Sequence, residues 1–77
     1  MKIAYAKQAV KALMRLDVNT RKRIHKCIHE LPEGDVKRLK SFTNLYRLRI
    51  GNWHIIFTMI ANDIMIEDVL PRGSAYK

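Results

Sequence analysis

The chain has 77 residues, a length that predicts a single domain. Its apolar fraction of 48% excludes a disordered chain, and no apolar run reaches the 18 residues of a membrane helix. Fifteen lysines and arginines against seven acidic residues give a formal net charge of +8. Since no signal-peptide pattern is present either, we expect a soluble cytoplasmic protein. Its charge would attract a nucleic acid, an acidic protein or an anionic membrane surface.

The first half of the chain predicts a short strand followed by two helices. Residues 2–5 are predicted to form the strand, and apolar residues at helical spacing predict the first helix over 6–16. Capping residues follow, and the second helix begins at Asn19 or Thr20 and ends before Pro32 and Gly34. The two helices should form an antiparallel hairpin with one apolar seam.

The second half changes to a period of two residues after a loop at 33–44. Three strands are predicted, at 45–50, 53–60 and 64–70. Gly51-Asn52 supplies the first two-residue turn, and Asn62-Asp63 the second. The fold class is therefore α+β: an N-terminal strand and an α-helical hairpin pack on one face of a mostly antiparallel sheet. The sheet ends in a three-stranded meander.

The turn at Gly51-Asn52 fixes which side chains share a face, because side chains alternate along a strand. The core face carries seven large residues: Tyr46, Leu48, Ile50, Trp53, Ile55, Phe57 and Met59. The other face carries Leu45, Arg47, Arg49, His54, Ile56 and Thr58.

In the third strand, Ile64, Ile66 and Leu70 would join the core face, and Met65, Glu67 and Val69 the other. That pattern turns Asp68 toward the core. Either a bulge exists there, or Asp68 lies at the edge beside a basic partner.

Arg47, Arg49 and His54 should therefore gather on the face opposite the helices. One interpretation is that these residues form an ordinary solvated strand face. The arginine guanidinium, however, is a planar fork of donors that matches phosphate oxygens, which favours an anion site. No metal or cofactor is expected, because the side chains of Glu67 and Asp68 alternate across their strand. The single Cys27 excludes an internal disulfide and is interpreted as a buried helix thiol.

The chain resembles the RelE/ParE superfamily of toxins over essentially its whole length, as a single domain spanning 1–77. The matching segments are GDVKRLK at 34–40, LYRLRIGNWHIIF at 45–57 and the basic tail PRGSAYK at 71–77. The resemblance to the RelE branch implies a toxin of a type II toxin–antitoxin pair. Such a toxin is a metal-independent endoribonuclease that cleaves mRNA in the ribosomal A site.

The resemblance also implies which residues act. The catalytic set would be Arg47, Arg49, His54, Arg72 and Tyr76. Lys37, Arg38 and Lys40 would bind RNA as a phosphate-binding loop. His54 stands where RelE-like members often have arginine, and an imidazole gains or loses a proton near neutral pH.

The arginines would stabilise the phosphorane formed during cleavage, with His54 or Tyr76 as acid or base. Tyr76 could instead stack on an RNA base, or be a terminal residue with no role.

Two other functions share this pattern. A ParE-type toxin would inhibit DNA gyrase and leave RNA intact, and a non-catalytic relic would only bind nucleic acid or antitoxin. The family implies a cognate acidic antitoxin that wraps the helices and covers the basic face. We expect the free toxin to be a monomer or a weak dimer that does not bind membranes.

Overall fold

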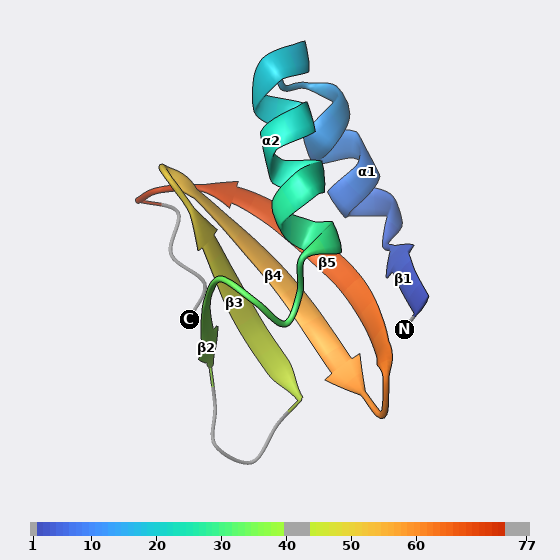
Figure 1. Ribbon diagram of the computed structural model, residues 1–77. Helices are drawn as coiled ribbons and strands as arrows, with labels where there is room; N and C mark the ends of the chain where they lie inside the picture. Colours follow the sequence, from blue (N-terminus) through green and yellow to red (C-terminus); the bar gives the residue numbers. More distant parts are fainter. Residues whose placement is uncertain (1, 40–43, 74–77) are drawn as a thin grey trace.

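A five-stranded sheet carries two helices on one of its faces (Figure 1). The structure, a computed structural model, describes residues 2–39 and 44–73. The elements in chain order are β1 (Lys2–Tyr5), α1 (Lys7–Met14), α2 (Val18–His29), β2 (Asp35–Arg38), β3 (Leu45–Ile50), β4 (Trp53–Ile60) and β5 (Asp63–Pro71). In the sheet the strands lie in the order β1-β5-β4-β3-β2. Among the described strands, β1 alone pairs in parallel, with β5, and the other pairs are antiparallel, so the predicted α+β class is confirmed.

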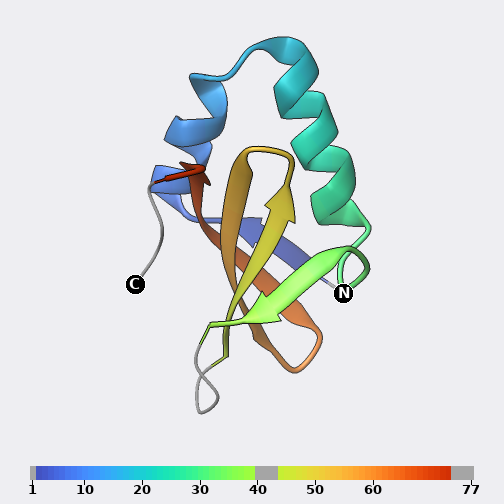
Figure 2. The same cartoon turned by 90° about the vertical axis from the view of Figure 1, so that its left-hand side faces the viewer.

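The two helices form the expected antiparallel hairpin (Figure 2). The side chain of Asp17 accepts a hydrogen bond from the backbone N–H of Thr20 at 3.0 Å and caps α2. This cap satisfies one of the donors that every helix leaves free at its start. Because Asp17 is the cap, α2 begins at Val18 rather than at the predicted Asn19 or Thr20.

The core lies between the helices and the sheet face that the alternation predicted. Leu48, Ile50, Ile55 and Phe57 are buried there, and Tyr46, Trp53 and Met59 pack against them. The helices contribute the buried residues Ala9, Ile24 and Ile28, and Leu31 is buried just beyond α2. Cys27 is half-buried against the same cluster, less covered than the predicted buried thiol.

The β3–β4 hairpin has the predicted register. Ile50 pairs with Trp53, so Arg49 lies opposite His54 and Arg47 opposite Ile56. Gly51 has φ of +55°, the left-handed conformation in which glycine lacks the steric penalty of other residues. The turn residues therefore place Arg47, Arg49 and His54 on the face away from the helices.

Two predictions about the chain path are wrong. Part of the expected loop at 33–44 is the edge strand β2, which pairs with β3 so that Asp35 lies opposite Arg49 and Lys37 opposite Arg47. The second turn is Ala61-Asn62 rather than Asn62-Asp63, because Ile60 pairs with Asp63. Ala61 adopts a positive φ of 55° there.

A β-bulge in β5 resolves the awkward position of Asp68. Ile56 pairs with Asp68, whereas the next residue, Phe57, pairs with Ile66, so β5 holds one extra residue. Of the two alternatives that the sequence left open, the bulge is confirmed. The carboxylate of Asp68 accepts a hydrogen bond from Gln8 of α1 at 3.0 Å rather than meeting a basic partner. The extra residue reverses the alternation beyond it. Val69 is therefore in the core and Leu70 pairs with His54, the opposite of the prediction.

Candidate anion-binding site on the open sheet face

A polar hollow of about 620 Å³ opens on the sheet face away from the helices. Its lining comes from three strands, the turn that joins two of them and the residue that follows β5: Asp35, Arg47, Arg49, Gly51, His54 and Arg72. The predicted residues Arg47, Arg49, His54 and Arg72 are thus brought together. Register and alternation explain the first three, since they lie on adjacent antiparallel strands and point to the same side.

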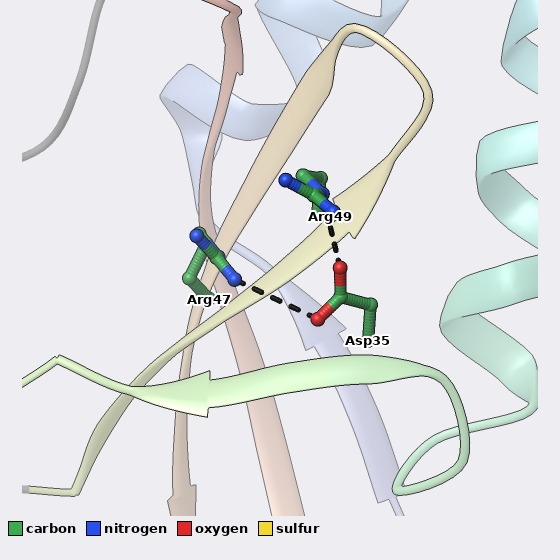
Figure 3. Close-up of polar contacts among 3 residues, drawn as sticks. All are labelled: Asp35, Arg47 and Arg49. Carbon is green, nitrogen blue, oxygen red and sulfur yellow. Dashed lines mark ion pairs between the residues drawn. The ribbon is translucent and has the colours of Figure 1, made fainter.

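Asp35 lies between the two arginines of β3 and contacts both (Figure 3). Its Oδ2 is 3.0 Å from Nε of Arg49, and its Oδ1 is 3.7 Å from Nη2 of Arg47. Sequence reasoning missed this residue because it placed residue 35 in a loop. The alternation of Asp35, Val36 and Lys37 is the signal that could have revealed a strand with a charged outer face.

The two arginines differ in burial. The side chain of Arg47 is 21% exposed and that of Arg49 is 57% exposed. Ile56, the cross-strand neighbour of Arg47, is also buried, although it lies on the open face. Nε of Arg47 is buried without a hydrogen-bond acceptor among the described residues. Packing therefore fixes Arg47 and leaves part of its donor capacity unused, whereas Arg49 extends into the hollow.

His54 and Arg72 complete the lining from the other side. His54 is half-buried and lies between Arg49 of β3 and Leu70 of β5. Arg72 follows the last residue of β5, and its backbone N–H donates to the carbonyl oxygen of Asn52 at 2.6 Å. That bond ties the chain after β5 to the tip of the β3–β4 hairpin. An arginine distant in sequence thus reaches the same hollow.

The structure separates the predicted RNA-binding residues. Lys37 lies on the same face as Arg47, which it opposes. Arg38 lies on the other face, where its Nη2 donates to the hydroxyl of Tyr46 at 2.8 Å and its guanidinium lies 5.3 Å from the centre of the Tyr46 ring. Lys40 and Tyr76 lie outside the described residues.

The charge of this face suits an anion. Arginine guanidinium groups match phosphate geometry, and Arg47, Arg49 and Arg72 outnumber the single carboxylate of Asp35 in the hollow. Within residues 2–39 and 44–73, no three His, Cys, Asp or Glu side chains gather closely enough to hold a metal ion. In the same part of the chain, no helix is long and apolar enough to cross a membrane.

The structure defines a small basic α+β protein with an arginine-rich hollow on its open sheet face. No family model matches the chain. Toxin RelE3 of Methanocaldococcus jannaschii is 34% identical to it, over 99% of this chain and 96% of that protein. The chain therefore belongs to the RelE toxin family.

Solved structures agree with this assignment. RelE in the RelB–RelE complex from Methanococcus jannaschii matches with a TM-score of 0.77 and 33% identity, over 92% of each chain. The archaeal RelE–RelB complex from Pyrococcus horikoshii contains a chain with a TM-score of 0.79 and 27% identity, over 96% of this chain and 97% of that one. The intact RelBE complex from E. coli shares the fold, with a TM-score of 0.74 at 13% identity.

Proposed function

We propose that this toxin is a metal-independent endoribonuclease that cleaves mRNA in the ribosomal A site. The observation that carries the proposal is the convergence of Arg47, Arg49, His54 and Arg72 on one open hollow. Cleavage of a ribose phosphate backbone needs cations that stabilise negative charge and a group that transfers protons. Three guanidinium groups and an imidazole can supply both. The open sheet face also leaves room for an RNA strand to reach them.

Cleavage requires attack of the ribose 2′-oxygen on the neighbouring phosphorus and departure of the 5′-oxygen. One group takes the proton of the 2′-OH, and another supplies a proton to the leaving 5′-oxygen. Negative charge grows on the phosphorane oxygens in between, and fixed cations stabilise it without reorganising. We assign this stabilisation to Arg47, Arg49 and Arg72. His54 and Tyr76 are the acid and base, and Lys37 extends phosphate binding along the same face.

An acidic antitoxin is the partner we propose for this basic chain. The relatives from Methanococcus jannaschii and Pyrococcus horikoshii were solved as complexes with RelB. A formal charge of +8 on 77 residues favours a partner of opposite charge. Such a partner would cover the hollow and block RNA.

Primer extension on mRNA in a translating extract tests the proposed nuclease activity. The wild-type toxin should produce cuts that require ribosomes and persist in EDTA-treated toxin preparations. Arg72→Ala and His54→Ala should each lower the cleavage rate by about a hundredfold or more, the typical effect of losing one charge-stabilising or proton-transferring group. Arg15→Ala is the matched control, because it removes one exposed arginine at the end of α1 and should cleave normally.

The outcomes separate the alternatives. Intact mRNA together with gyrase-dependent DNA damage would identify a ParE-type toxin instead. Intact mRNA and intact DNA would leave a binding module without catalysis. Full cleavage by both Arg72→Ala and His54→Ala would reject the residue assignment and retain the activity.

A further inference from the structure

We propose that Asp35 is a positioning residue, which orients Arg49 and Arg47 for the RNA phosphate at the cost of one unit of positive charge. This inference rests on the nuclease function proposed above. Asp35 is the only carboxylate in the lining of the hollow, within the part of the chain that the structure describes. A carboxylate in a site for polyanions weakens binding, so its position calls for a compensating role.

The geometry gives that role. Asp35 lies directly opposite Arg49 on the neighbouring strand, and its two oxygens contact different arginines, at 3.0 Å for Arg49 and 3.7 Å for Arg47 (Figure 3). The two arginines are two residues apart on one strand, about 7 Å at the backbone, and their like charges repel each other. The carboxylate between them offsets this repulsion and lets both side chains point into the same hollow.

The two arginines depend on Asp35 to different degrees. Arg47 is mostly buried, so packing already restricts its side chain. Arg49 is 57% exposed, and the contact between its Nε and Oδ2 of Asp35 is what restricts it. That contact uses the inner nitrogen of the guanidinium, so both terminal nitrogens of Arg49 keep their donors for a phosphate. Loss of Asp35 should therefore disorder Arg49 far more than Arg47.

Removing the negative charge of Asp35 should lower KM, whereas removing its positioning role should lower kcat. Replacing Asp35 by asparagine makes the face more positive, which strengthens RNA binding and lowers KM. The same change frees Arg49, which slows the chemical step. If Arg49 is then in place about a tenth of the time, kcat falls about tenfold. A carboxylate that merely repelled RNA would give a lower KM with unchanged kcat, and a purely structural residue would leave both constants of the folded enzyme unchanged.

The experiment compares wild type with Asp35→Asn, Asp35→Glu and Glu33→Gln. Glu33→Gln is the matched control: it removes an exposed carboxylate two residues away that makes no ion pair within the described residues. Cleavage of mRNA on programmed ribosomes gives kcat and KM, and thermal unfolding reports folding. We expect about tenfold lower kcat with equal or lower KM for Asp35→Asn, partial recovery for Asp35→Glu, and wild-type values for Glu33→Gln.

A second measurement does not depend on cleavage. The Nε–H signal of Arg49 in an NMR spectrum should be distinct and slow to exchange in wild type, and should move to the position of a free arginine in Asp35→Asn. An unchanged Arg49 signal, or kcat within twofold of wild type in Asp35→Asn, would overturn the positioning role. If wild type does not cleave mRNA, the proposed nuclease function fails, and the Arg49 signal still decides whether Asp35 positions that side chain.

Discussion

Replacing Gly51 by alanine and replacing Ala61 by glycine should change the stability of the fold in opposite directions. Gly51 and Ala61 both have φ of +55°, yet only one of them is glycine. A left-handed conformation costs a residue with a Cβ about 1–2 kcal/mol. Glycine in turn loses about 0.4–1 kcal/mol through its greater freedom in the unfolded chain. The difference leaves about 1 kcal/mol, so Gly51→Ala should destabilise the fold by that amount and Ala61→Gly should stabilise it by the same amount.

Steric contact adds little to this difference. A Cβ at Gly51 would meet its nearest neighbour, Nη1 of Arg23, at 3.4 Å, and that atom is the end of a flexible side chain. The two turns lie at opposite ends of the eight-residue strand β4, about 26 Å apart at the usual rise of a strand. Effects at sites so far apart usually add, so the double variant should be close to wild type.

Thermal and urea unfolding followed by circular dichroism would measure the effect. For a domain of this length, 1 kcal/mol corresponds to about 6 °C in Tm. We expect Tm to fall by about 6 °C in Gly51→Ala and to rise by about 6 °C in Ala61→Gly. If both variants moved Tm in the same direction, the backbone-strain reasoning would be refuted.

Three further predictions concern single side chains. Burial raises the pKa of Tyr5 above 10.0, and its hydroxyl has no hydrogen-bond partner among the described residues. The unfolded chain therefore releases the tyrosine proton first, and stability falls as pH rises through 10.0. Tyr5→Phe should flatten that alkaline loss in pH-dependent melting and add up to about 1 kcal/mol at neutral pH. Hydrogen bonds from the side chain and backbone of Thr20 lower the pKa of Asp17 below 3.8. The cap stabilises the fold above pH 3.8 and loses its effect as pH falls through the folded-state pKa, so the Tm deficit of Asp17→Ala should shrink in acid. A deficit independent of pH would contradict a charged cap. Ile24→Val removes one methyl group from a fully buried position of α2 and should cost about 1 kcal/mol in urea unfolding. No measurable change would mean that α2 packs elsewhere.

Local rules predicted most of the fold. Alternation and the Gly51-Asn52 turn were sufficient to predict the register of β3 and β4, because a two-residue turn allows one pairing of the strands it joins. The same register places Arg47, Arg49 and His54 on the open face as predicted. Their catalytic roles stay predictions, as do those of Arg72 and Tyr76.

The local rules failed at the turn before β5 and within β5 itself. Asn62-Asp63 has turn-forming residues, yet the chain turns at Ala61-Asn62 and accepts a positive φ at Ala61. The change of turn shifts the pairing by two residues, so Ile64 and Ile66 lie on the core face with either turn, and their burial does not explain why the chain turns at Ala61. The bulge at Glu67 and Asp68 then shifts the alternation, so Val69 rather than Leu70 is buried.

By itself, the sequence determined the helices, the central hairpin and the surplus of basic charge, because each depends on residues close together in the chain. The tertiary structure decided that 35–38 forms an edge strand, since four residues become a strand only when β3 supplies hydrogen-bond partners. It thereby placed a carboxylate between two arginines. It also joined Arg72 to the hairpin tip through a backbone bond to Asn52. Both contacts join segments that are far apart in the sequence. A pattern of neighbouring residues does not show which distant segments will meet.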